Sequence, residues 1–416
     1  MVSNSISRRW RELASGKRTL AAAMLGVAFG INSLPFYTAG LFISALHVDR
    51  GWSLSSLSLG PTLLVAVMAI SAPFIGQAFD RFGERRFILP GLLVQAAGFF
   101  LLSRSEGLLG YLLPLGSMAL LGAGCSSPAY LRVVNRAFDV SKGAALALTI
   151  TGAALFSAIV PPLLQRIIAT SGWRGGYLAL AAVVLCATPF ILLLLGKDAA
   201  PAKTAEPAAD STDFRYATLF ASPAFLPLTL AIAAIAIAAP GLLIHFTSLL
   251  TRSGLSALEA AWMISLIGGA QIVSRLMTGT LVDQFFAPRV AAVIMVAASA
   301  GIGLLAWDGA RWAMAGAVAV GLAYGAEADL VGYFAGRYYV PEHFGRVFGA
   351  FYAVFLAGTA ISPSLYGLAV DRFGSYTPAL AGASLLLLVA ASLFLMLPRF
   401  PTPQAIEEAK SENVIC

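Results

Sequence analysis

Three ionisable side chains lie inside stretches of sequence that are otherwise apolar, namely Arg275, Glu327 and Asp329. A charged group in such a stretch is expensive to bury, so it needs a water-filled cavity or a partner. The planar guanidinium of Arg275 suits a carboxylate, which it can bind through two parallel hydrogen bonds. A carboxyl group kept away from water holds its proton more tightly, so Glu327 or Asp329 could carry a proton.

Each of these three residues also has a structural interpretation. Arg275 could form a buried pair with Asp283, eight residues further along. On a helix, Glu327 and Asp329 point about 200° apart, so at most one of them faces a central cavity. The other could pair with Arg337, and both could be structural.

Four further polar side chains in apolar stretches are candidates for contact with a ligand: Asn32, Tyr37, His245 and Tyr352. Amide, phenol and imidazole groups can all donate hydrogen bonds to an anion, and imidazole also titrates near neutral pH. Each of them could instead satisfy a neighbouring helix. For His245 this structural role is the favoured interpretation.

A cluster of charged residues with regular order is Gly76-Gln-Ala-Phe-Asp80-Arg81-Phe-Gly83-Glu84-Arg85-Arg86. The small Gly76 would let two helices approach closely. Asp80 can accept hydrogen bonds from an arginine or a helix end, and the arginines can form charge-assisted contacts. Basic loop residues also follow from membrane topology alone. The fixed order of glycine, aspartate and arginine favours a gating role. Arg132, near the inner end of the fourth span, could be a charge of the gate or of the cavity, and we favour the gate.

The elements that position these groups are membrane helices. The 416 residues are 59% hydrophobic and 11% charged, whereas a soluble domain carries about 25% charged residues. A soluble fold is therefore excluded. A span needs about 20 mainly apolar residues, and twelve stretches qualify: 20–46, 57–79, 87–104, 108–135, 143–168, 174–196, 222–249, 258–281, 289–307, 311–336, 346–368 and 375–397.

Lysine and arginine gather on one side of these spans. Nineteen of the 27 lie there, seven lie on the other side, and Arg275 is within a span. The positive-inside rule then places both termini in the cytoplasm and explains the net charge of +7 without a nucleic-acid partner. The three cysteines have no metal-ligand spacing, and we expect no metal and no cofactor.

The predicted domain plan has five parts: a cytoplasmic segment 1–19, six helices in 20–196, a linker 197–220, six helices in 221–398 and a cytoplasmic tail 399–416. The linker is rich in alanine and proline and cannot bury a core. The two halves look related, because several residues recur at nearly constant offsets. Gly51, Ser53 and Asp80 recur 203 positions later as Gly254, Ser256 and Asp283, and Gly124 and Arg136 recur 201 positions later as Gly325 and Arg337.

Residues 76–86 resemble the signature G-x-x-x-D-R-x-G-x-R-R of the major facilitator superfamily, and Gly279-Thr-Leu-Val-Asp283 is a weaker second copy. Residues 143–162, 172–177, 274–283 and 325–338 resemble the monocarboxylate and oxalate/formate transporter branch, the last in its bacterial members. The resemblance implies an all-α membrane protein with two pseudo-symmetric six-helix bundles and a midplane cavity. It also implies a monomer in the inner membrane that carries a small organic anion, of the monocarboxylate class, with protons or by exchange.

In that branch the arginine at the position of Arg275 binds the substrate carboxylate. This sequence departs from the animal members in two places, because Gln271 replaces an aspartate one turn earlier and Phe36 lies near the position of a first-span lysine. Gln271 therefore joins the predicted substrate-binding residues, and the animal scheme of proton coupling is not expected. The identity of the acid, the direction of transport, the choice between symport and antiport, the stoichiometry and the oligomeric state stay open.

A rival function is efflux of drug-like or amphipathic compounds by an antiporter. Arg275 separates the two, because an acid carrier needs a cation in its cavity whereas an exporter of cations would prefer an acidic residue. A membrane sensor or an enzyme with a lipid substrate is disfavoured. The loops are too short for a catalytic domain, and no nucleophile cluster occurs in the sequence.

Overall fold

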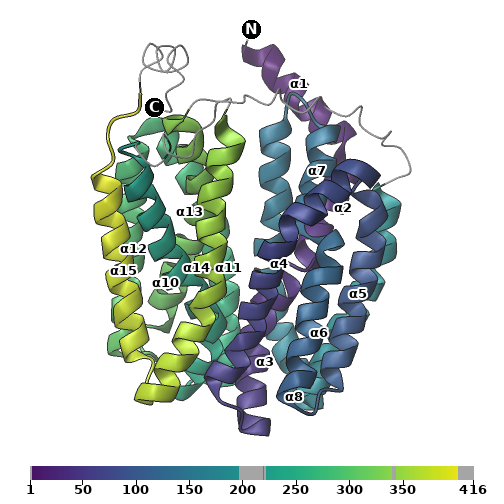
Figure 1. Ribbon diagram of the computed structural model, residues 1–416, viewed down its shortest axis with the longest axis vertical. Coiled ribbons are helices and arrows are strands. Elements are labelled where there is room, and N and C mark those ends of the chain that lie inside the picture. The colour runs from purple at the N-terminus through teal and green to yellow at the C-terminus, as the bar shows by residue number, and fades with distance from the viewer. Residues whose placement is uncertain (1, 196–218, 220–221, 340–342, 402–416) are drawn as a thin grey trace. The chain divides into compact units, whose positions relative to one another are not determined.

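The computed structural model describes residues 2–195, 219, 222–339 and 343–401, and over these ranges the chain is helical, without strands (Figure 1). The predicted linker 197–220 and tail 399–416 thus lie largely outside the described residues. The helices are α1 (Val2–Ser15), α2 (Lys17–Phe29), α3 (Leu34–Arg50), α4 (Leu54–Phe82), α5 (Arg85–Ser103), α6 (Leu108–Leu121), η1 (Gly122–Cys125), α7 (Ser127–Ala137), α8 (Lys142–Leu195), α10 (Phe225–Arg252), α11 (Ala257–Gln284), α12 (Ala287–Trp307), α13 (Ala313–Tyr338), α14 (Phe344–Phe373) and α15 (Thr377–Leu395).

Eleven helical stretches in the described part of the chain are long and apolar enough to cross a membrane. One of them, α8, consists of two helices joined at Gly172, whose φ of 68° and ψ of 176° are not helical. Counting α8 as two gives the twelve predicted spans. Large apolar side chains also cover the outside of the helices, and Leu193 and Phe74 are 78% and 67% exposed. Such a surface suits lipid rather than water, so the predicted all-α membrane fold is confirmed.

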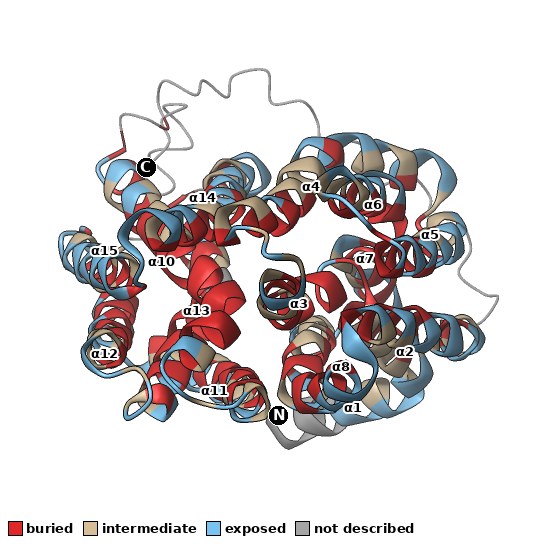
Figure 2. Cartoon of the chain, turned by 90° about the horizontal axis from the view of Figure 1, so that it is seen from below, coloured by how far each residue is buried: buried red, intermediate tan, exposed pale blue. Residues whose placement is uncertain are grey.

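The chain forms two compact units. The first contains residues 1–204 and 257–268, and the second contains 205–256 and 269–416, so that α11 is shared between them. In the first unit α8 packs on α2 and α5, and in the second α10 packs on α14 while α12 packs on α13 and α15. Within each unit the helix faces turned toward neighbours are buried and the opposite faces are exposed, and α13 is buried over most of its length (Figure 2).

Glycines with a positive φ recur at matching positions of the two units. Gly51 and Gly254 have φ values of 67° and 100°, and they lie 203 positions apart. Gly172 and Gly374 have φ values of 68° and 72°, and they lie 202 positions apart. Because side chains disfavour positive φ, these paired glycines mark equivalent turns and support the internal duplication inferred from the sequence.

Two spans that the sequence predicts as continuous are interrupted. The first breaks between α2 and α3, at residues 30–33, and the fourth breaks between α6 and α7, at residues 122–126. Glycines in both segments weaken the helix. Pro128 lies in the first turn of α7, where a missing amide proton does no harm.

The two interruptions pack against each other in the first unit. A Cβ atom on Gly30 would lie 2.5 Å from the carbonyl oxygen of Cys125, so only glycine fits there. The Phe29 carbonyl, which loses its helical partner, accepts a hydrogen bond of 3.0 Å from Gln95 Nε2. Irregular backbone at membrane depth needs such partners, because lipid offers none.

The N-terminal segment 1–19, predicted only as cytoplasmic, contains the helix α1, which Glu12 attaches to the start of α8. The Glu12 carboxylate accepts hydrogen bonds from Ser141 Oγ at 2.6 Å, from the Ser141 and Asp139 amides at 2.7 Å each, and from the Val140 amide at 3.3 Å. These bonds, led by that from the Ser141 hydroxyl, lower the pKa of Glu12 to about 2. The carboxylate therefore caps the N-terminus of α8 from outside that helix.

Candidate functional site

The segment 76–86 ends α4 and starts α5, and two of its acidic residues pair with arginines of α7. Asp80 Oδ1 pairs with Arg132 Nη1, and Glu84 Oε1 lies 3.0 Å from Arg136 Nη1. Arg132 and Arg136 are four positions apart on α7 and therefore lie on one face of that helix, so that the two ion pairs are neighbouring rungs along it. We call these two ion pairs the first clamp. They connect the α4–α5 turn to α7 within the first unit.

The glycines of this segment have different roles. Gly83 follows the last residue of α4 with a φ of 79°, a value that favours glycine, and makes the turn there. Gly76 is predicted to permit close helix approach, and that prediction is not tested by the packing within the first unit. A Cβ atom there would meet only Arg132 Nη2, at 4.0 Å. The remaining arginines of the segment lie on the outside of the turn or partly buried in it: Arg81, Arg85 and Arg86.

Asn32 lies where the two interrupted spans meet. Its Oδ1 atom accepts a hydrogen bond of 2.8 Å from the Ser127 amide, at the first residue of α7. The side chain as a whole is exposed, and its amide NH2 group can still donate. Tyr37, also predicted to bind substrate, is 7% exposed and packs edge-on against Phe36, with ring centroids 6.0 Å apart.

Arg275 lies in the interior of α11 and is half-buried. Gln271, which is 5% exposed, precedes it by four positions and therefore lies on the same face of the helix. Asp283 is exposed and forms no ion pair with Arg275 within the described residues. Eight residues of helix separate the two by about 12 Å along the axis. The structural alternative, a buried ion pair between Arg275 and Asp283, is therefore not formed.

Glu327 is enclosed in the second unit, where it is 2% exposed. Neither of its carboxyl oxygens has a hydrogen-bond partner within the described residues. Glu327 therefore does not pair with Arg337. The Arg337 guanidinium lies instead over the Phe400 ring, 4.8 Å from its centroid. Asp329 belongs to α13, but its side chain lies outside what the structure describes.

His245 is fully buried and contacts two other helices of the second unit through its ring nitrogens. Nε2 lies 3.0 Å from the Pro363 carbonyl oxygen, and Nδ1 lies 2.9 Å from the Tyr376 hydroxyl. A carbonyl only accepts, so Nε2 carries a proton, and in the neutral ring Nδ1 accepts from the hydroxyl. Both ring nitrogens are thus engaged by protein groups, which supports the structural interpretation of this histidine.

Tyr352 belongs to a row of stacked aromatic rings along α14. Its ring lies 5.6 Å from that of Phe348 and 5.5 Å from that of Phe355, with interplanar angles of 12° and 23°. The side chain is 38% exposed.

Two spans broken at membrane depth, a duplicated six-helix plan and a clamp built on the segment 76–86 describe a transporter architecture. The profile of the Major Facilitator Superfamily matches residues 25–363, which is more than half of the chain. The chain belongs to the Major Facilitator Superfamily.

Within this superfamily the chain is similar to carriers of different kinds. Monocarboxylate transporter 11 of Homo sapiens is 28% identical over 395 residues, covering 89% of this chain and 82% of that protein. The fujikurins efflux protein of Gibberella fujikuroi is 24% identical over 234 residues, covering 55% of this chain and 49% of that protein. These relatives are membrane transporters, and the chain is a multi-pass membrane transporter rather than an enzyme.

Solved structures of two transporters share its fold. A D-xylose–proton symporter gives a TM-score of 0.69 at 14% identity and covers 93% of this chain and 97% of its own. A nucleoside transporter gives a TM-score of 0.73 at 12% identity and covers 92% and 100%. At these identities the likeness concerns the fold alone.

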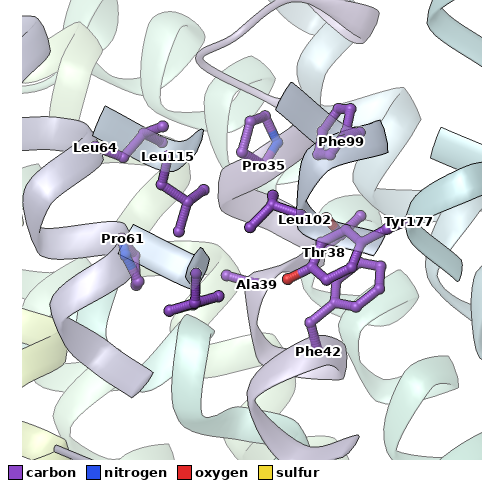
Figure 3. A pocket seen from close by; sticks show the side chains of 11 residues that line it. Pro35, Thr38, Ala39, Phe42, Pro61, Leu64, Phe99, Leu102, Leu115 and Tyr177 are labelled. Atoms are coloured by element: carbon purple, nitrogen blue, oxygen red, sulfur yellow. The ribbon is translucent and has the colours of Figure 1, made fainter. Parts of the chain in front are cut away.

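A small cavity in the first unit of this facilitator is not a site for an organic anion (Figure 3). It measures about 20 Å³ and is lined mainly by apolar side chains, among them Phe42, Leu64 and Phe99. The Thr38 and Tyr111 hydroxyls that border it donate to backbone carbonyls. Its volume suits a single water molecule, and none of the predicted substrate-binding residues lines it.

Sequence reasoning assigned no role to Glu84 or Phe400, although both hold arginines of this facilitator. Glu84 occupies a variable position of the signature, and only its four-residue spacing from Asp80, matched by Arg132 and Arg136, could have indicated the pair. Phe400 lies beyond the last predicted span. Nothing in the local sequence indicates its contact with Arg337.

Proposed function

We propose that this facilitator moves a small organic anion, of the monocarboxylate class, across the membrane by alternating access. The observation that carries the proposal is a half-buried arginine, Arg275, in the interior of the eighth span. An ionised residue at such a depth is by default functional, and a guanidinium binds a carboxylate through two hydrogen bonds at once. Gln271, one turn earlier on the same face, can donate to the same ligand.

The first unit offers a second group of polar donors. The Asn32 amide stands at the meeting point of two interrupted spans, and discontinuous helices line the substrate sites of many transporters. Tyr37 lies in α3, five residues after Asn32. Tyr352 on α14 supplies a hydroxyl from the second unit. We assign Arg275, Gln271, Asn32, Tyr37 and Tyr352 to substrate binding, while His245 supports α14 and α15.

The similarity to monocarboxylate transporters supports the substrate class, and the motif resemblance to the oxalate/formate branch and to its bacterial members points the same way. On this proposal the protein is a monomer in the inner membrane with both termini and the linker in the cytoplasm. The distribution of lysine and arginine supports that orientation. The first clamp then lies on the cytoplasmic side, where it holds the α4–α5 turn during gating.

Transport is driven by protons or by exchange, and Glu327 is our proton site. A carboxyl group that is 2% exposed and lacks hydrogen-bond donors in the described part of the chain is accommodated as the neutral acid. A transport step that opens it to water would release the proton. Asp329, two residues later, is the alternative proton carrier.

Efflux of a larger compound is the second candidate, favoured by the similarity to the fujikurins efflux protein over 55% of the chain. Phe36, which is 5% exposed, stands near the position where the resembled branch has a cation. Its apolar ring would suit a bulkier, less polar substrate. Both functions use the same fold, so only a measurement of which compounds the protein transports can distinguish them.

The test is uptake of labelled lactate, pyruvate, formate, oxalate and an aromatic acid into proteoliposomes. The panel is compared between wild type, Arg275→Ala, Arg275→Lys and a control, Arg289→Ala, which removes an exposed arginine. Hydrogen bonds to a charged group contribute about 1.5–3 kcal/mol, so Arg275→Ala should weaken uptake about tenfold to a hundredfold. Normal uptake by Arg275→Ala, or no uptake of any acid, contradicts the proposal and favours efflux.

A further inference from the structure

Phe400, which follows the last span, is held at one end of the second unit by a ring of aromatic side chains. Its ring centroid lies 4.9 Å from that of Tyr338, 5.2 Å from that of Phe286 and 6.3 Å from that of Tyr333. The Arg337 guanidinium covers it at 4.8 Å. Two residues earlier, the Pro398 carbonyl accepts a hydrogen bond of 2.7 Å from the Tyr338 hydroxyl.

These partners come from different helices. Tyr333, Arg337 and Tyr338 belong to α13, whereas Phe286 lies at the turn between α11 and α12. Tyr333 also donates a hydrogen bond of 3.2 Å to the Val282 carbonyl near the end of α11. Phe400 therefore connects α13 to the α11–α12 turn, and Pro398 and Phe400 complete a packed cluster with these elements.

The internal duplication relates this cluster to the first clamp. With the offsets of 203 and 201 positions, the counterparts of Glu84 and Arg136 are Ala287 and Arg337. The second unit thus keeps the arginine but has an alanine at the position that corresponds to its acidic partner. In place of that acid the arginine has the face of Phe400, which attracts a cation through its π electrons.

The second ion pair of the first clamp, Asp80–Arg132, also has no ionic counterpart in the second unit. The counterpart of Asp80 is Asp283, and that of Arg132 is Tyr333. Asp283 is exposed and without an ion pair among the described residues, while Tyr333 bonds to the backbone of the residue just before it. The helix-to-turn connection is therefore ionic in the first unit and aromatic in the second.

We propose that Phe400, together with Arg337 and Tyr333, forms a second clamp that closes the cytoplasmic end of the second unit, so that this tail residue is a positioning residue of the transport cycle. The proposal rests on the alternating-access transport proposed above. It does not depend on which substrate is carried. Loss of the Phe400 ring should loosen the α11–α13 contact and admit water to buried atoms of α11.

The first experiment measures access to Val282→Cys, a position that is 7% exposed, in a background in which Cys125, Cys186 and Cys416 are alanine. A charged maleimide is added to purified protein without substrate. Phe400→Ala should react at least fivefold faster than the parent, and Phe400→Trp should react like the parent. The control is Phe285→Ala, which removes a neighbouring ring that is 61% exposed. Equal rates for all variants, or the same acceleration by Phe285→Ala, would overturn the proposal.

A transport measurement separates gating from folding. Phe400→Leu keeps apolar volume but has no π face, so it remains informative if Phe400→Ala does not fold. Phe400→Leu and Arg337→Gln should each lower the maximal uptake rate several-fold while leaving KM within twofold, with melting temperatures close to wild type. A changed KM with an unchanged maximal rate would contradict the clamp. Because the thiol assay contains no substrate, the second clamp and the monocarboxylate proposal can fail independently.

Discussion

Arg136 Nη1 lies 3.0 Å from Glu84 Oε1, and the Glu84 side chain is 2% exposed. The neighbouring pair differs, because the side chain of Asp80 is 68% exposed. Ion pairs in contact with water contribute little, whereas a buried carboxylate depends on its partner. The two rungs of the first clamp should therefore respond differently to neutralisation.

We expect Glu84→Gln to lower the free energy of unfolding by about 1–3 kcal/mol, because a charge-assisted bond is replaced by a weaker one. Asp80→Asn should cost less than about 1 kcal/mol but should slow transport. Thermal unfolding in detergent, read by intrinsic fluorescence, measures the first effect and uptake measures the second. Equal melting temperatures for the two variants would contradict this assignment.

The attachment of α1 should depend on pH only under acid conditions. Hydrogen bonds lower the pKa of Glu12 to about 2 from an ordinary value of 4.5. A lowered pKa means that the carboxylate contributes fully above pH 4.5 and that its contribution is lost as the pH falls toward 2.

A spin label at Ser15→Cys, in the background without the native cysteines, can follow this attachment. Its mobility should stay constant from pH 7 to pH 5 and rise between pH 4.5 and pH 2. Glu12→Gln should give the mobile spectrum throughout, because an amide replaces the carboxylate that accepts these bonds. A transition near neutral pH would show that another group controls the attachment.

Glu327→Gln should uncouple transport from protons while the protein still folds. The amide resembles the protonated acid in shape and cannot ionise, so accumulation driven by a pH gradient should vanish. Exchange of internal for external substrate should persist. Counterflow and gradient-driven uptake in the same proteoliposomes measure the two activities. Unchanged gradient-driven accumulation would exclude Glu327 and leave Asp329 as the candidate.

The helical plan could be predicted from the sequence because membrane depth fixes the length of an apolar run. The signature around Asp80 and the pairing of that residue with an arginine were likewise accessible, since residue order carries the information. The interruptions at residues 30–33 and 122–126 were missed. Their glycines are common in membrane helices, and only the contact of Gly30 with Cys125 shows why the helix stops.

Contacts between residues far apart in the chain were beyond sequence reasoning. His245 contacts Tyr376, and Arg337 contacts Phe400. Neither contact could be inferred without knowing how α10, α13 and α15 pack. Carboxylates were expected near arginines because the residue types in a sequence show directly which side chains carry opposite charges. An aromatic ring in the same place leaves no such signal.

The engagement of His245 predicts a structural effect without an effect on substrate affinity. Tyr376→Phe removes the hydroxyl that bonds to Nδ1, and leaving a buried nitrogen unsatisfied costs about 1–3 kcal/mol. We expect a lower melting temperature and an unchanged KM for uptake. A raised KM with unchanged stability would return His245 to the substrate site.

Equilibrium binding of a labelled monocarboxylate to the purified protein, with Arg275→Ala and Arg289→Ala measured side by side, tests directly whether Arg275 binds the carboxylate. We expect saturable binding to wild type and to Arg289→Ala, and a dissociation constant raised about tenfold to a hundredfold in Arg275→Ala. Equal dissociation constants for all three proteins would contradict the claim that Arg275 binds the carboxylate.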